Sequence, residues 1–434
     1  MNVGDKARGL LLESFHTALA AADPLRVMPE HLLHGLPHVS GRILVVGAGK
    51  AAASMALAVE THLLRGTKND PVLDGIVLTR YGHGLPLKKI KVVEAGHPLP
   101  DEHGEQATRA ILEEVRKLRH EDFLLCLMSG GGSSLMSLPI DSVPIADLRK
   151  LTSELLRSGA EIHEINIVRK HLSKILGGRL AASSGAPVLA LIISDVAGDD
   201  PTDIASGPCA PDPTTYSDAL EILDRYEIKA SYAVMETLQD GILGRLPETP
   251  KPGEPVLQHV ENRVIATARD ALMGAKEFVR NQGIPAVIMS DSVTGEAREV
   301  AKVMTAVAKE IHRYAQPWKP PVVLIAGGET TVTVKRNGRG GRNTEFLLSL
   351  AIELNGLEGV YALAGDTDGI DGTEDNAGAL VTPDTLSRAK QLGLKPPTLL
   401  ADNNSYEFFE KLGDLIVTGP TRTNVNDFRA ILIG

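Results

Sequence analysis

A glycine-rich loop with three arginines and one lysine is the first place where this chain could bind an anion. The loop follows an apolar run and spans residues 327–345, with its basic side chains at Lys335, Arg336, Arg339 and Arg342. Glycines let a ligand approach the backbone N–H groups closely, and a guanidinium presents a planar pair of donors that matches phosphate oxygens. A basic hairpin turn has a similar composition, so the loop taken alone fits either interpretation.

A second loop, residues 129–134, contains three consecutive glycines flanked by serines. Such a run is entropically costly, which suggests that a ligand needs the bare backbone. We predict an oxyanion or phosphate cradle, with a strained tight turn as the alternative. The Gly-x-Ser-x-Gly pattern of serine hydrolases is absent. The residues expected to contact a ligand are Ser129, Gly130, Gly131, Gly132 and Ser133.

A third loop has the sequence Gly47-Ala48-Gly49-Lys50-Ala51-Ala52. Its spacing fits the dinucleotide pattern Gly-x-Gly-x-x-Ala, in which the helix N-terminus attracts a phosphate. The acidic residue expected after the next strand is missing, because that strand ends at Arg80; a site for the 2′-phosphate of NADP stays open. The loop is not a Walker motif. We expect Gly47, Gly49 and Lys50 to contact a phosphoryl group.

Aspartates follow two other apolar runs. Asp195 and Asp199 lie in Ser-Asp-Val-Ala-Gly-Asp-Asp, and Asp366 begins Asp-Thr-Asp-Gly-Ile-Asp-Gly. Mg²⁺ takes one or two carboxylates and completes its shell with phosphate oxygens and water, so these positions are candidate ligands. The pattern does not fit an EF-hand, because position twelve, counted from Asp366 as position one, is Ala377 rather than Glu. Turn formation or helix capping is the alternative role of each aspartate.

A basic segment, residues 166–178, has a helical pattern that places Lys170 and Lys174 on one face, next to Arg169. Such a face could neutralise a substrate carboxylate or nucleotide phosphates, and a solvated helix side explains it equally well. Lys170 is therefore a candidate ligand residue, while His97 and His171 are left without an assigned role.

Short apolar strands alternate with helical patterns along the chain. Residues 42–46, 75–79, 123–128 and 188–194 are apolar, as buried parallel strands are, and residues 51–65 form an alanine-rich helix. These units predict a doubly wound α/β sheet with ligand loops at the carboxyl ends of its strands. Strand and helix patterns resume after a proline-rich stretch at 247–258, which looks like a linker. We expect two α/β domains, residues 1–240 and 241–434.

Composition excludes several classes of protein. The 434 residues include 45 basic and 55 acidic side chains, a net charge of −10, which argues against a nucleic-acid groove. The only cysteines, Cys126 and Cys209, lack metal-type spacing, and we expect both to be reduced in the cytoplasm. Neither a signal peptide nor a membrane-spanning run is evident. Partners are expected to be small molecules, and a homo-oligomer is left open.

Taken together, the motifs resemble the glycerate 2-kinases whose C-terminal part is a MOFRL domain. Besides the loops above, the resemblance rests on Gly96-His-Pro-Leu-Pro-Asp101, Ser206-Gly-Pro208 and the stretch Thr418–Asp427. It covers nearly the whole chain, and the motifs are specific jointly rather than singly.

The resemblance implies two non-similar three-layer α/β/α domains, with a Rossmann-like N-terminal one, a cleft between them, and a MOFRL region at about 320–430. It implies ATP- and Mg²⁺-dependent phosphorylation of D-glycerate to 2-phosphoglycerate. Lys50 and Arg342 match the suspected catalytic pair of the family, and Asp195 is expected to bind Mg²⁺ or to act as the base. The loops also make Glu329, Asn343 and Asp366 candidate ligand residues. The alternatives are an NADPH-dependent hydroxypyruvate reductase and a non-catalytic sensor of nucleotides or sugar acids.

Overall fold

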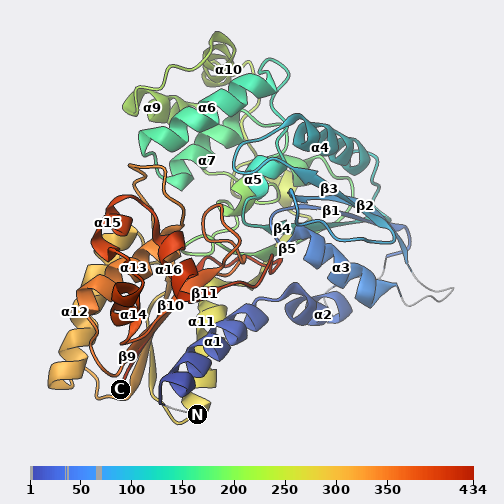
Figure 1. The fold of residues 1–434 in the computed structure, drawn as a ribbon. Helices are drawn as coiled ribbons and strands as arrows, with labels where there is room; N and C mark the ends of the chain where they lie inside the picture. Colours follow the sequence, from blue (N-terminus) through green and yellow to red (C-terminus); the bar gives the residue numbers. More distant parts are fainter. Residues whose placement is uncertain (1–2, 35, 37–38, 65–70) are drawn as a thin grey trace. The chain divides into compact units, whose positions relative to one another are not determined.

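The computed structural model describes residues 3–34, 36, 39–64 and 71–434, and the chain divides into two compact units (Figure 1). The N-terminal unit is Pro24–Ile265, and the C-terminal unit combines Met1–Asp23 with Ala266–Gly434. Both are α/β structures, as predicted. No helix among the described residues is long and apolar enough to cross a membrane.

The N-terminal unit is built on a six-stranded sheet of order β3-β2-β1-β4-β5-β6, in which β1 to β5 run parallel. Every residue of the central strand β4 is buried, which explains its continuous apolar sequence. The main elements are α2 (Pro24–His34), β1 (Arg42–Ala48), α3 (Ala52–Leu63), β2 (Val72–Arg80), β3 (Ile90–Ala95), α4 (Glu102–Val115), β4 (Phe123–Ser129), α5 (Gly132–Leu135), α6 (Ile145–Ser158), α7 (Ile162–His171), α8 (Arg179–Ala182), β5 (Val188–Ile193), α9 (Tyr216–Arg225), α10 (Tyr232–Ile242) and β6 (Val260–Ala266).

The order of these strands is that of the Rossmann-like folds, as expected. The chain winds outward from β1 to β2 and β3, then returns to place β4 on the other side of β1. The boundary between β1 and β4 is therefore the topological switch point, where ligands of such sheets usually bind. Helices α6, α7, α9 and α10 form a separate apolar cluster in the same unit (Figure 1).

The C-terminal unit has a mixed sheet of order β11-β10-β9-β12-β8-β7. Strand β12 runs antiparallel to both β8 and β9, which the sequence pattern did not predict. Helices α1 and α11 pack against the sheet, as do α12 and α13. Its elements are α1 (Val3–Ala21), α11 (Ala268–Asn281), β7 (Ala286–Ser290), α12 (Ala297–Tyr314), β8 (Val322–Gly328), α13 (Arg342–Leu354), β9 (Val360–Asp366), β10 (Gly378–Val381), α14 (Thr385–Gln391), α15 (Pro396–Ala401), α16 (Ser405–Leu412), β11 (Leu415–Ile416) and β12 (Asp427–Ile433).

The division between the units differs from the expected boundary at residue 240 in two places. Helix α1 belongs to the C-terminal unit, where the ring of Phe15 lies 5.7 Å from that of Phe428. Residues 241–265 stay with the N-terminal unit, because β6 extends its sheet beside β5. The proline-rich stretch is no linker, since Thr249 within it hydrogen-bonds the buried Asp212.

Two predicted helices also end differently. The helix expected over 51–65 is α3, and Arg65 lies outside the described residues. The helix expected over residues 166–178 stops at His171, so Lys170 and Lys174 do not share a helical face.

Candidate active site

The glycine loops after β1 and β4 lie against each other at the switch point of the N-terminal sheet. The backbone N–H of Lys50 donates to the carbonyl of Gly130 at 2.9 Å, and the N–H of Ala51 donates to Ser129 Oγ at 3.1 Å. A side chain at Gly49 would meet that Ser129 oxygen at 2.1 Å. The predicted loops therefore form one structure, and their glycines are required by the close approach of two backbones.

The second glycine loop also brings His97 and Lys50 together. Gly131 has a positive φ of 83°, and a Cβ there would lie 2.9 Å from the His97 ring and 3.7 Å from Lys50 Cγ. A side chain would occupy the space beside the lysine stem. The structure thus keeps bare backbone next to a lysine, a combination that suits an anion.

The loop after β5 supports the glycine loop from the other side. Ser206 Oγ lies 2.8 Å from Ser133 Oγ, and a Cβ at Gly132 would lie 2.6 Å from the Cβ of Ala205. Ala205 and Ser206 both have positive φ, at 52° and 57°. Non-glycine residues hold such angles only where the surrounding contacts impose them, and these strains cluster at functional sites.

The candidate metal ligands lie at the start of this same loop. Asp195 follows β5 at the carboxyl edge of the sheet, and Asp199 turns the loop with a φ of 55°. Within the described part of the chain, no group of three or more His, Cys, Asp or Glu side chains is arranged to hold a metal. Asp195 and Asp199 as Mg²⁺ ligands stay a prediction.

In the C-terminal unit, Arg342 begins α13 and is fixed by three carboxylates. Its Nε donates to both oxygens of Asp427 at 2.8 and 3.0 Å, and its Nη2 donates to Asp366 at 2.7 Å. Nη1 forms an ion pair with Glu329 at 3.1 Å.

The ends of three strands supply these carboxylates. Asp427 opens β12 and pairs in register with Gly328, the last residue of β8, and with Asp366, the last residue of β9. Burial alone would lower the pKa of Arg342, but the negative charges of Asp427, Asp366 and Glu329 raise it well above its ordinary value. The guanidinium is thus a permanent, oriented charge.

A second layer holds this arginine's helix in place. Asp371 is buried and accepts hydrogen bonds from the backbone N–H groups of Asn343 and Thr344, both at 2.9 Å, at the start of α13. Burial raises the pKa of Asp371, and these hydrogen bonds partly offset the rise. Asn343 is fully buried and donates to Asp427 at 2.7 Å. Asn343 therefore positions the carboxylate, and its contact with a ligand stays a prediction.

Sequence reasoning gave no role to Arg429 or to its partner Asp427. Arg429 is fully buried, bonds Asp427 Oδ2 at 2.5 Å and lies 5.3 Å from the centre of the Phe346 ring. Burial lowers its pKa, and Asp427 opposes that effect. Asp427 is thus shared by two guanidinium groups. The sequence feature that could have indicated a role for these residues is the pair of opposite charges two positions apart in the otherwise apolar strand Asp-Phe-Arg-Ala-Ile-Leu-Ile.

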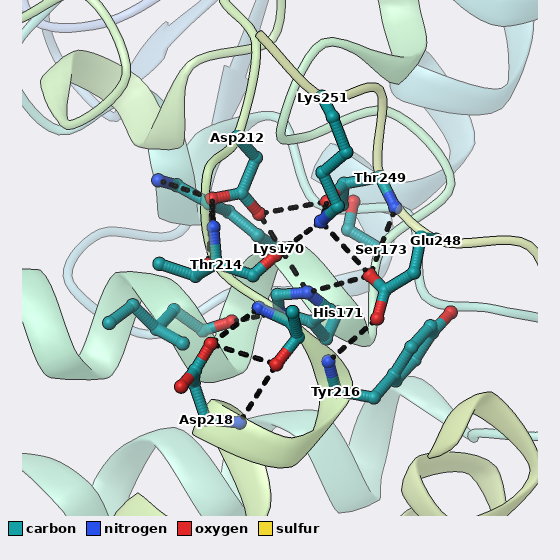
Figure 2. A network of polar contacts seen from close by, with 12 residues as sticks. Lys170, His171, Ser173, Asp212, Thr214, Tyr216, Asp218, Glu248, Thr249 and Lys251 are labelled. Atoms are coloured by element: carbon teal, nitrogen blue, oxygen red, sulfur yellow. Dashed lines mark hydrogen bonds and ion pairs between the residues drawn. The ribbon is translucent and has the colours of Figure 1, made fainter. Parts of the chain in front are cut away.

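Lys170, predicted to contact a ligand, instead belongs to a buried polar network (Figure 2). Its Nζ donates to Thr202 at 3.1 Å and pairs with Asp212 at 3.5 Å. Nearby, His171 Nε2 lies 3.3 Å from Glu248, and burial lowers the pKa of this histidine more than Glu248 and Asp212 raise it. This network fastens α7 to the loop that carries Ser206.

The network predicts that Lys170→Met destabilises the fold. Removing one partner of a buried pair leaves Asp212 uncompensated, so we expect a loss of about 3–5 kcal/mol in the free energy of unfolding. Urea denaturation followed by circular dichroism would measure it. Lys174→Met is the matched control, because its partner Asp141 is exposed, and it should cost less than about 1 kcal/mol. A stable Lys170→Met protein with weakened ligand binding would restore the ligand role instead.

Comparisons with known proteins agree with this geometry. Residues 10–239 match the model of a domain of unknown function, DUF4147, and residues 322–427 match the MOFRL family. D-glycerate 2-kinase of Thermotoga maritima is 42% identical over 98% of this chain and 97% of its own length. The chain belongs to the glycerate 2-kinase family.

Two further relatives of the family show how far the likeness extends. A crystal structure of glycerate kinase from Thermotoga maritima superimposes with a TM-score of 0.86 and 41% identity, covering 99% of this chain and 100% of that one. A protein of Agrobacterium vitis carries the provisional name hydroxypyruvate reductase; it is 47% identical over 99% of this chain and 95% of its own length. Members of one family therefore carry names from two reaction classes, a kinase and a reductase.

Proposed function

We propose that this chain transfers the γ-phosphoryl group of ATP to the 2-hydroxyl of D-glycerate, giving 2-phosphoglycerate and ADP. The observation that carries the proposal is that the chain has two features suited to binding phosphate and belongs to a family whose members include glycerate 2-kinases. One feature is the pair of glycine loops after β1 and β4, beside Lys50, and the other is the oriented guanidinium of Arg342.

The chemistry asks mainly for alignment and neutralisation of charge. The 2-hydroxyl oxygen attacks the γ-phosphorus, the bond from that phosphorus to the bridging oxygen breaks, and ADP leaves while the hydroxyl proton passes to a base. The N–H groups of residues 130–132 and the Lys50 ammonium bind phosphate oxygens. Arg342 has five N–H donors. Among the described residues, two of them donate to Asp427 and Asp366, and Nη1 pairs with Glu329, so we propose that the remaining donors serve the transferring group.

Asp195 is proposed as the ligand of a Mg²⁺ ion that ATP brings with it, with Asp199 as a further candidate. Mg²⁺ would neutralise charge on the phosphates. The protein contributes one carboxylate to this site, Asp195, which follows β5. The loop that begins there carries Ser206, which contacts Ser133 of the glycine loop.

A cytoplasmic location is part of the same proposal. Both cysteines are free thiols buried in the core, as a reducing compartment permits.

A coupled assay tests the proposed reaction. The protein is incubated with ATP, Mg²⁺ and D-glycerate, and product is detected through enolase, which accepts 2- but not 3-phosphoglycerate. We expect a signal that disappears without ATP. A parallel reaction contains NADPH and hydroxypyruvate. Oxidation of NADPH with no enolase signal would show that the Gly47–Ala52 loop serves a dinucleotide and that the kinase proposal is wrong.

Asp195→Asn should raise the Mg²⁺ concentration needed for half-maximal activity by roughly 10- to 100-fold, the range typical of lost partners in metal sites. High Mg²⁺ should restore most of the rate. Titration of the coupled assay with MgCl₂ would measure this, with Asp224→Asn, an exposed position on α9, as the control. A variant that saturates at the ordinary Mg²⁺ concentration but stays slow would identify Asp195 as the base.

A further inference from the structure

A small cavity lies beside the glycine loop in the N-terminal unit. Ser133, Ser134, Ser137 and Thr152 are among the residues that line it, together with Arg169 and apolar side chains such as Leu138. Its volume is about 10 Å³, which is room for a single water-sized group. The cavity therefore excludes a nucleotide and admits only the end of a small molecule.

The serines of this cavity are held in place by the glycine loop itself. Ser134 Oγ donates to the carbonyl of Gly131 at 3.1 Å, and Ser137 Oγ donates to that of Ser133 at 3.0 Å. Ser133 directly follows the glycines that lie beside Lys50. One short segment thus borders the lysine through Gly131 and the cavity through Ser133.

Arg169 is the charged group of the cavity, and no carboxylate of the described residues forms an ion pair with it. Among the residues that the structure describes, its one polar partner is the amide oxygen of Asn166, which lies at a long 3.4 Å from Nη1. Burial lowers the pKa of Arg169 to about 10, with no opposing carboxylate. The adjacent Lys170, on the same helix, does form an ion pair, with Asp212.

A desolvated guanidinium without an anion is costly, and the cost is recovered when an anion binds. The proposed substrate brings one at its end, since D-glycerate is a small acid with a carboxylate next to the carbon that bears the 2-hydroxyl. An ATP phosphate is the other anion in the reaction, but a nucleotide is too large for this cavity.

We infer that Arg169 binds the carboxylate of the acceptor acid, with one carboxylate oxygen in the serine-lined cavity. This inference rests on the proposed function. It makes Arg169 the residue that distinguishes glycerate from neutral polyols, because a neutral ligand leaves the guanidinium uncompensated. Gly131, two residues before Ser133, lies beside the stem of Lys50, which we assign to the phosphates.

Calorimetric titration of the full chain with D-glycerate, in the presence of a non-hydrolysable ATP analogue, tests the inference by binding alone. Arg169→Met should raise the Kd for glycerate by roughly 10- to 150-fold, the value of a hydrogen bond to a charged group, and should leave the Kd of the ATP analogue within about twofold. Arg157→Met, an exposed arginine on the neighbouring α6, is the matched control and should change neither.

Glyceramide, the neutral amide of the same acid, gives a second readout. Wild-type protein should bind glyceramide far more weakly than glycerate, and Arg169→Met should lose most of that discrimination. Arg169→Lys keeps the charge and serves if the methionine variant does not fold. It should bind glycerate more weakly than wild type but still prefer it to the amide.

The outcomes separate this inference from the proposed function. If wild-type protein does not bind glycerate, both fail. If wild-type protein binds glycerate and Arg169→Met or Arg169→Lys binds it equally well, only the role of Arg169 is overturned. A loss of affinity for the ATP analogue with unchanged glycerate binding would assign Arg169 to a phosphate and overturn the inference as well.

Discussion

The arginine held by carboxylates at the edge of the C-terminal sheet sets the arrangement of that whole edge. Arg342 draws Asp427 from β12, Asp366 from β9 and Glu329 from the end of β8 to one point. The antiparallel insertion of β12 between β8 and β9 makes this convergence possible, because the first residue of one strand lies beside the last residues of two others. Without Arg342, the buried carboxylates of Asp427 and Asp366 would lose their shared cation, at high cost, although Asp427 would keep Arg429.

The N-terminal unit solves a related problem with backbone rather than side chains. Parallel strands β1 and β4 end next to each other, and the loops that follow them are joined by hydrogen bonds between Lys50, Ala51 and the 129–130 segment. Close approach requires glycine at 49 and 131, and the strained Ala205 and Ser206 brace the loop from the side. The result is a rigid set of N–H donors, which is how a protein stabilises phosphate charge without reorganisation.

Sequence reasoning succeeded where the signal was local. Continuous apolar runs identified the buried strands, and glycine runs after them identified loops that the structure brings together at the switch point. It failed where tertiary contacts decide the outcome. The spacing of Lys170 and Lys174 does not reveal that the helix ends at His171. Nor does it reveal that Lys170 is buried and pairs with Asp212, which lies 42 residues further along the chain. The assignment of α1 to the C-terminal unit depends likewise on contacts such as Phe15 with Phe428. Asp427 and Arg429 were hidden because a charged pair within a strand becomes meaningful only when the neighbouring strands are known.

The central claim is that the carboxylates around Arg342 act by holding its guanidinium for the transferring phosphoryl group. A double-mutant cycle on the turnover number of glycerate phosphorylation, with Arg342→Ala, Asp366→Asn and the pair, tests it most directly. Arg342→Ala should lower turnover by roughly 3 to 5 orders of magnitude, as loss of an arginine finger does. Asp366→Asn should slow the wild type but have little further effect once the arginine is gone. Arg336→Ala, an exposed arginine in the same loop, should change little. Independent, additive losses from Arg342→Ala and Asp366→Asn, or near-normal turnover in Arg342→Ala, would contradict the account.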